Sequence, residues 1–236
     1  MLYVYGIIDG SEIRTTPPLG HHRSSVMALP VGGLAAAVSD ATASDIVPTV
    51  ENVWRHDRIV DALMAGQAVL PMRFGSTACR DWLAAALERR RGTLRRMLDR
   101  VSGRVEIAVR VVSTLPESPV RSGTPDQRGE AWSSGTDYLR SRMAPRQGRS
   151  APACTDGRAV AASILARLET MSADVVWGRG DARTLPVEAS FLIARHGVGD
   201  FVDTAETLAS RNPELAVNCT GPWAPYSFVT DAVTEA

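Results

Sequence analysis

The fold of this chain is decided by Arg104-Val105-Glu106-Ile107-Ala108-Val109-Arg110-Val111-Val112. Branched apolar residues occupy every second position of this stretch, and Arg104, Glu106 and Arg110 lie between them. Such an alternation predicts a β-strand that buries one face and leaves the other face polar. Because Ser102-Gly103 directly precedes the strand and ends a helical pattern, the strand begins a new unit of structure.

Five further elements follow this strand. We predict a helix from about residue 157, strands over residues 174–178 and 188–195, a helix over residues 199–210 and a last strand over residues 215–219. This order is typical of a ferredoxin-like domain, an antiparallel four-stranded sheet with two helices on one face. We therefore assign residues 103–236 to a ferredoxin-like C-terminal domain. Within it, residues 113–157 are rich in proline, serine and glycine, which predicts a flexible insertion.

The first hundred residues predict a separate α+β unit. Strands are expected over residues 2–9, 26–30, 34–38 and 68–74, and helices over residues 51–65 and 81–101. Gly32-Gly33 separates the second and third of these strands and predicts a tight hairpin, because glycine readily adopts the positive φ values that such turns require. The whole chain is thus predicted to be an α+β protein with two domains, residues 1–102 and residues 103–236.

The composition favours a soluble cytoplasmic protein. The chain has 26 basic and 26 acidic residues, so no global field attracts it to nucleic acid or to an anionic membrane. Every basic residue is arginine, which removes Schiff-base lysines and the lysine of a phosphate-binding P-loop. Cys79, Cys154 and Cys219 are too few and too scattered for a disulfide framework or a zinc site. No run approaches the ~18 apolar residues of a membrane span.

No pattern predicts a catalytic centre, a cofactor site or a metal site. His56 falls on the apolar stripe of its helix, where a hydrogen-bonded core histidine is expected. His21-His22 stands in a loop rich in proline and glycine without a third metal ligand, so a solvated loop is expected. His196 follows a strand and is expected at the surface. Cys79 precedes a helix whose N-terminus favours a thiolate, but the sequence identifies no base for it.

The end of the chain concentrates its aromatic residues. Trp223, Tyr226 and Phe228 fall within six residues, although the whole chain is only 6% aromatic. Two prolines and a glycine between residues 221 and 225 exclude a helix there. Such a segment either packs back on a core or presents its aromatic side chains to a partner. We expect the tail, residues 220–236, to fold back across the domain boundary, with exposure of Trp223 or Tyr226 to a partner as the alternative.

Four stretches together resemble the gas vesicle protein GvpF/GvpL family. They are Tyr3-Val4-Tyr5-Gly6-Ile7, Val69-Leu70-Pro71-Met72-Arg73-Phe74-Gly75-Ser76, Gly103-Arg104-Val105-Glu106-Ile107-Ala108-Val109-Arg110, and Ala189-Ser190-Phe191-Leu192-Ile193 followed by Thr220-Gly221-Pro222-Trp223-Ala224-Pro225-Tyr226-Ser227-Phe228-Val229. They occur in the family's order and span nearly the whole chain. The resemblance also implies a modified ferredoxin-like C-terminal domain.

The resemblance implies a function without an enzymatic reaction. It implies an accessory or minor structural protein of the gas vesicle, which contacts the hydrophobic shell protein GvpA and other accessory proteins during assembly. The residues of the family motifs that we expect at a partner surface or at an interdomain contact are Trp223, Tyr226, Phe228, Arg73 and Phe74. The expected location is the cytoplasm, in association with gas vesicles.

Two other functions remain open from the sequence. The first is a small-molecule-binding or catalytic α+β protein, since His56, Cys79 and Arg73 lie near the ends of predicted elements, where sites are often built. The second is RNA or DNA binding through the arginines between Arg89 and Arg100 on the long helix. Acidic residues around these arginines favour a solvated or protein-contacting face over a nucleic-acid interface.

Overall fold

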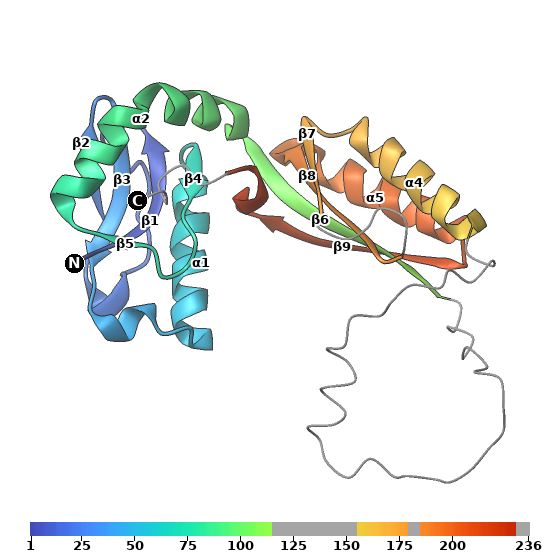
Figure 1. Cartoon of the computed structure of the whole chain (residues 1–236), viewed down its shortest axis with the longest axis horizontal. Coiled ribbons are helices and arrows are strands. Elements are labelled where there is room, and N and C mark those ends of the chain that lie inside the picture. The colour runs from blue at the N-terminus through green and yellow to red at the C-terminus, as the bar shows by residue number, and fades with distance from the viewer. Residues whose placement is uncertain (115–154, 179–184, 230–236) are drawn as a thin grey trace, which may run out of the picture.

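Two antiparallel sheets with associated helices make up the protein in the computed structural model (Figure 1). The structure describes residues 1–114, 155–178 and 185–229. This arrangement confirms the predicted α+β fold. Most of the predicted insertion 113–157 and the last residues of the tail, 230–236, lie outside the described residues. At the borders of that insertion, Ser113 still belongs to a strand and Thr155 already begins a helix.

The first sheet has five strands. They are β1 (Leu2–Asp9), β2 (Met27–Val31), β3 (Leu34–Asp40), β4 (Val69–Pro71) and β5 (Thr77–Ala78). The strand order is β2-β3-β1-β4, and β5 also pairs with β1. The predicted hairpin between β2 and β3 is confirmed, because Gly32 and Gly33 form its turn with φ angles of 57° and 83°.

Two helices, α1 (Val50–Met64) and α2 (Arg80–Val101), cover opposite faces of the first sheet. Side chains of α2 share one apolar cluster with Val4 and Ile7 of β1. Side chains of α1 share another cluster with Tyr3 and Tyr5 of the same strand. Alternate residues of β1 therefore face different helices, which explains why seven of its eight residues are buried.

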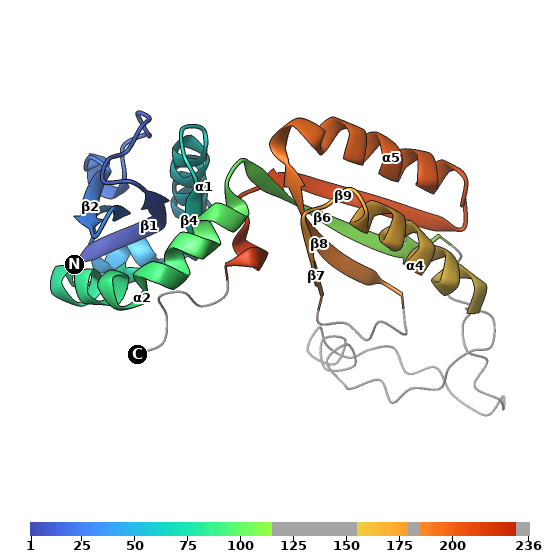
Figure 2. The ribbon, with the colours of Figure 1, turned by 90° about the horizontal axis from the view of Figure 1, so that it is seen from above.

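The second sheet has four strands, and two helices of the described segments pack on it. The strands are β6 (Arg104–Ser113), β7 (Asp174–Trp177), β8 (Val187–Ala194) and β9 (Leu215–Trp223), and the helices are α4 (Thr155–Glu169) and α5 (Val198–Ser210). The strand order is β7-β8-β6-β9, and all neighbouring strands are antiparallel. Both helices lie on the same face of the sheet (Figure 2), where they bury Ile107, Val109 and Val111 of β6. The apolar residues that alternate in the β6 sequence are therefore the residues that face the two helices.

The last strand is longer than predicted. We expected it to end at residue 219, but β9 continues to Trp223, which pairs with Glu106. The continuation passes a register shift between Glu106 and Ala108, and Gly221 adopts a φ angle of 129° beside it. A Cβ at position 221 would lie 2.8 Å from the carbonyl oxygen of Glu106, so glycine permits this close approach.

Short connections complete the described chain. Four 3-10 turns occur, η1 (His21–Arg23), η2 (Ala43–Ile46), η3 (Arg195–Gly197) and η4 (Tyr226–Phe228). Helix α2 leads through Ser102 and Gly103 directly into β6. The last helix that packs on the first sheet is thus joined to the first strand of the second sheet almost without a linker (Figure 1). Among the helices of the described segments, none has the length and apolar character needed to cross a membrane.

Candidate functional site

The C-terminal strap, residues 224–229, connects the second sheet to the first (Figures 1 and 2). It leaves β9 after Trp223 and makes the short turn η4. Ala224 belongs to the apolar cluster beneath α1, and Phe228 belongs to the cluster beneath α2. Both side chains are buried. The strap therefore reaches the two apolar clusters of the first sheet while its first residue follows the last strand of the second.

His56 of α1 lies at the centre of the strap's polar contacts. Its Nε2 is 3.0 Å from the carbonyl oxygen of Met72 and 3.2 Å from the hydroxyl of Tyr226, and its Nδ1 is 3.0 Å from the hydroxyl of Tyr3. A carbonyl oxygen can only accept, so Nε2 carries the proton and Nδ1 accepts from Tyr3. The oxygen of Tyr3 in turn accepts from the backbone N–H of Gly75 at 2.9 Å. One directed chain of hydrogen bonds thus links β1, α1 and the segment after β4.

Burial favours the neutral forms in this cluster. It lowers the pKa of His56 to about 4, so the ring is neutral at pH 7 and can accept the proton of Tyr3. Burial, followed by the carboxylate of Asp57, raises the pKa of Tyr226, whose hydroxyl donates to Asp57 over 3.4 Å. Burial also raises the pKa of Asp57, while the hydrogen bond from Tyr226 acts in the opposite direction. The prediction of a hydrogen-bonded core histidine is confirmed at His56.

Glu106 of β6 binds the strap from the second sheet. Its carboxylate accepts from the backbone N–H of Ser227 at 2.9 Å and from the Ser227 hydroxyl at 2.7 Å. The same hydroxyl lies 3.2 Å from that of Ser190 on β8. Glu106 is only 5% exposed although it lies on the face of β6 that points away from α4 and α5. Hydrogen bonds to a carboxylate are stronger than neutral ones, so these two bonds tie the strap to the central strand.

Phe228 packs where the end of α2 meets the second sheet. Its ring belongs to the same buried cluster as Leu98 of α2 and Leu192 of β8. The guanidinium of Arg100 lies 5.9 Å from the ring centre and forms an ion pair with Asp174 of β7. Phe228 therefore shares a buried cluster with side chains of both sheets and of the helix that joins them, with the Arg100 cation near its ring.

The other predicted contact residues lie in different surroundings. Phe74 is half-buried, and its ring meets those of Tyr3 and His56 edge-on at 6.2 and 6.0 Å. Phe74 and Tyr226 therefore belong to one aromatic cluster around His56. Trp223 is 53% exposed at the end of β9, and Arg73 is exposed. The structure thus brings Tyr226 and Phe74 together and leaves Trp223 and Arg73 accessible.

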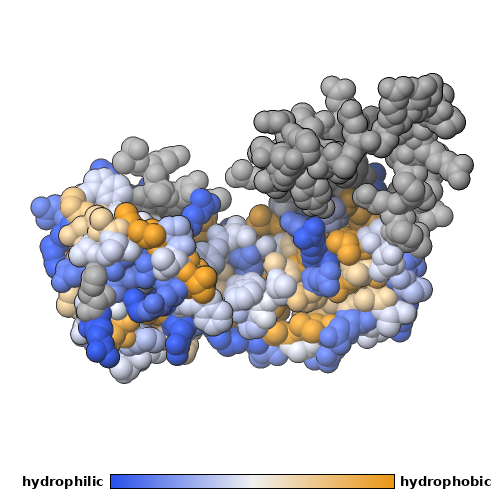
Figure 3. Space-filling view, turned by 90° about the horizontal axis from the view of Figure 1, so that it is seen from below, coloured by the Kyte–Doolittle hydropathy of each residue, from blue (hydrophilic) through white to orange (hydrophobic). Residues whose placement is uncertain are grey.

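An exposed apolar surface that we did not predict begins at η2 and continues along α1. Its large side chains are Ile46, Val47, Val50 and Trp54, and Trp54 exposes 67% of its area. Figure 3 shows hydrophobic residues on one side of the molecule as separate patches between hydrophilic ones. The sequence signal for this surface is a run from Ala41 to Val50 in which Asp45 is the only charged residue, and Asp45 is buried.

The prediction of a solvated loop is wrong at His21. The residue is fully buried, its ring stacks on that of Tyr5, and its Nδ1 lies 3.4 Å from a carboxylate oxygen of Asp45. Gly20 explains the difference, because a Cβ there would lie 2.8 Å from the Tyr5 hydroxyl. The loop therefore comes close enough to β1 to bury the following residue. By contrast, His196 is exposed, as predicted.

The residues considered for catalysis do not converge. Arg73 and Cys79 line the same surface groove at the start of α2, but His56 lies under the strap and is not among the residues of that groove. Within residues 1–114, 155–178 and 185–229, no group of three His, Cys, Asp or Glu side chains is placed to hold a metal ion. His56 is therefore not placed to act as a base for Cys79.

The arginines of α2 are partly engaged within the protein. Arg95 pairs with Asp9 of β1, Arg91 lies 3.4 Å from Glu88, and Arg100 pairs with Asp174. These pairs follow the helix and join it to both sheets. They favour the alternative of a solvated, protein-contacting helix face over an open basic surface for nucleic acid.

Comparison with known proteins identifies the family. The family model described as gas vesicle synthesis protein GvpL/GvpF matches residues 1–230. The chain belongs to the GvpL/GvpF family. Two relatives come from Streptomyces sp. strain CB03234. Gas vesicle protein L is 31% identical over 85% of this chain and 77% of its own length, and gas vesicle protein F is 30% identical over 96% of this chain and 98% of its own length.

The fold of this GvpL/GvpF family member is also that of a solved relative. The crystal structure of the gas vesicle protein GvpF from Anabaena sp. PCC7120 matches with a TM-score of 0.68 and covers 97% of this chain and 98% of its own. At 18% identity, this match concerns the fold alone. The resemblance of the sequence motifs is therefore confirmed at the level of the family, and relatives in it are gas vesicle proteins by name.

Proposed function

We propose that the protein is a non-enzymatic accessory or minor structural protein of gas vesicles, which contacts the hydrophobic shell protein GvpA and supports vesicle assembly. The match of the family model to residues 1–230 carries this proposal. Relatives named F and L each align with most of the chain, which supports a role that involves the whole protein. Its proposed location is the cytoplasm, in association with gas vesicles, and other accessory proteins are its proposed further partners.

We further infer two domains, residues 1–102 and a ferredoxin-like domain of residues 103–236, joined by the strap as a clasp. The order β6-α4-β7-β8-α5-β9 and the strand order β7-β8-β6-β9 support the ferredoxin-like description. Each sheet packs against its own helices, and the second sheet has its own apolar cluster. Phe228 is buried within the chain and Tyr226 is half-buried against His56 and Asp57, which favours an interdomain role for both, whereas Trp223 is accessible to a partner.

Gene deletion tests the role in assembly. In a strain that makes gas vesicles, removal of the gene should abolish or strongly reduce gas-filled vesicles, and the intact gene on a plasmid should restore them. Normal vesicle number and shape in the deletion strain would contradict an essential role in assembly. Vesicles are counted by electron microscopy and by pressure-sensitive light scattering.

Co-purification with GvpA tests the proposed contact and the exposed tryptophan. The parent protein should retain GvpA, and Trp223→Ala should retain less if the end of β9 takes part in the contact. Tyr226→Ala serves as the comparison, because its side chain is engaged with His56 and Asp57. A folded Trp223→Ala variant that binds as well as the parent would remove Trp223 from the contact surface.

A further inference from the structure

A groove of about 580 Å³ runs along the first sheet between the segment that follows β4 and the first turn of α2. Its buried floor includes Val4, Met72 and Leu83, and the half-buried ring of Trp82 forms part of its wall. Apolar side chains and a tryptophan wall are typical of surfaces that bind the anchor residues of a partner.

Arg73 is the one charged residue among those that line the groove. Its side chain is exposed, and it forms no ion pair with any residue in the described part of the chain. The guanidinium therefore gives the groove a positive rim beside an apolar floor. A carboxylate complements such a rim, because arginine binds carboxylates with two parallel hydrogen bonds.

The adjoining strand is too short to bind an extended peptide. Strand β5, which lines the groove, has only two residues, Thr77 and Ala78. Addition of a partner strand to a sheet edge requires a row of backbone hydrogen bonds. An occupant of this groove must therefore be held by its side chains. An amphipathic helix meets this requirement, since residues three and four positions apart present their side chains on one face.

We propose that this groove binds an amphipathic helix of a partner protein, whose apolar side chains contact Trp82 and the floor and whose carboxylate pairs with Arg73. This inference rests on the proposed function, because the partner is expected among gas vesicle proteins and GvpA is the protein used to test binding. The groove then supplies the surface that the proposed contact requires. The strap and Trp223 belong to a different part of the chain.

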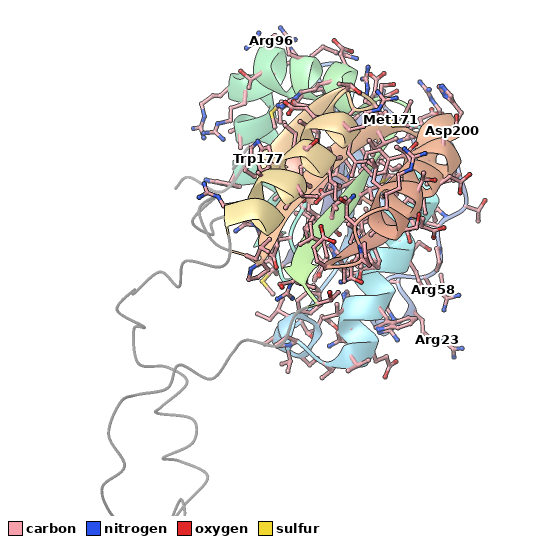
Figure 4. The ribbon with its side chains drawn as sticks, turned by 90° about the vertical axis from the view of Figure 1, so that its right-hand side faces the viewer. Arg23, Arg58, Arg96, Met171, Trp177 and Asp200 are labelled. Atoms are coloured by element: carbon pink, nitrogen blue, oxygen red, sulfur yellow. The ribbon has the colours of Figure 1, made fainter. Side chains whose placement is uncertain are left out.

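Matched variants of the full-length chain test the groove. Arg73→Glu should weaken the affinity for GvpA by about tenfold or more, because it replaces the pairing cation with a repelling charge. Arg73→Lys should lose less affinity than Arg73→Glu, because lysine keeps the positive charge but not the two parallel hydrogen bonds. Trp82→Ala should lose about tenfold or more, because it removes an aromatic anchor. Arg96→Glu makes the same charge change near the other end of α2, where Figure 4 shows Arg96 on the outside of the helix. Trp54→Ala removes an equally large side chain from the exposed surface of α1.

The expected result is a loss of affinity for Arg73→Glu and Trp82→Ala and binding within about twofold of the parent for Arg96→Glu and Trp54→Ala. Because Arg73 is exposed, its replacement by glutamate should leave the fold intact. Arg73→Glu therefore decides the test even if circular dichroism shows that Trp82→Ala does not fold. Parental binding by a folded Arg73→Glu variant would refute the groove and leave the proposed contact intact. An equal loss for Arg96→Glu and Arg73→Glu would also refute it, since general charge would then be the cause. No binding by the parent protein would refute the contact with GvpA and the groove together.

Discussion

Replacement of Phe228 by alanine should release the strap, whereas replacement of Trp223 by alanine should not. The two aromatic residues are five positions apart, but Phe228 is 2% exposed and Trp223 is 53% exposed. Phe228 belongs to a cluster that includes side chains of α2 and β8. Its removal therefore deletes apolar contacts on both sides of the junction between the sheets.

The expected cost follows from this burial. Truncation of a buried phenylalanine to alanine costs about 3–5 kcal/mol in protein cores. We expect about 3 kcal/mol for Phe228→Ala, at the lower end, because a strap near the end of the chain can detach without unfolding either sheet. For Trp223→Ala we expect a change within about 0.5 kcal/mol, as is usual for exposed positions away from buried features.

Hydrogen exchange measures the release directly. A loss of about 3 kcal/mol corresponds to about hundredfold faster exchange, and the backbone N–H of Ser227, which donates to Glu106, should report it. Urea unfolding followed by far-UV circular dichroism gives the accompanying change in stability. If Phe228→Ala exchanged at the parental rate at Ser227 and unfolded at the parental urea concentration, the strap would not hold the sheets together.

Three further predictions concern the surroundings of the strap. Because burial lowers the pKa of His56 to about 4, against about 6.5 in the unfolded chain, the unfolded state binds the proton first. The stability conferred by neutral His56 should therefore be complete above pH 6.5 and fall by about 2–3 kcal/mol towards pH 4.5. The raised pKa of Asp57 changes the stability in the opposite direction over this range. In urea titrations at several pH values, His56→Gln should make the stability depend less steeply on pH. Glu106→Gln replaces one accepting oxygen by an NH₂ group and should cost about 1–3 kcal/mol, with faster exchange at Ser227; unchanged exchange would argue against this anchor. Gly6→Ala should destabilise the first sheet by about 1–3 kcal/mol in thermal melts, because its Cβ would lie 2.7 Å from Cγ1 of Val69, and a melting temperature equal to the parent's would contradict the close approach.

The sequence predicted those elements whose pattern is local. The alternation in β6, the helical stripe of α2 and the Gly32-Gly33 turn each depend on neighbouring residues, and the structure shows each of them within a few residues of the expected bounds. The predicted end of β9 was too early because Gly221 and Pro222 usually interrupt strands. The register shift in the facing strand, which lets β9 continue, has no signal in the β9 sequence itself.

The surroundings of the strap could not be read from the sequence, because they depend on contacts between distant segments. His56 and Tyr226 are 170 positions apart, and Glu106 and Ser227 are 121 positions apart. The aromatic concentration indicated that the tail packs or binds, but it did not separate buried Phe228 from exposed Trp223. At His21 the missing information was the same, since its burial depends on how closely the loop approaches β1.

Glu106 shows why the second sheet is incomplete without the strap. The alternation of β6 places this carboxylate on the face opposite α4 and α5, where a four-stranded antiparallel sheet that stood alone would expose it to water. It is nevertheless 5% exposed, and the donors to its two oxygens both come from Ser227. A buried carboxylate is costly unless it is hydrogen-bonded, so the burial of Glu106 and the docking of the strap depend on each other. Because Tyr226 and Phe228 hold the same strap against the first sheet, a change that undocks it should alter the surroundings of both sheets at once.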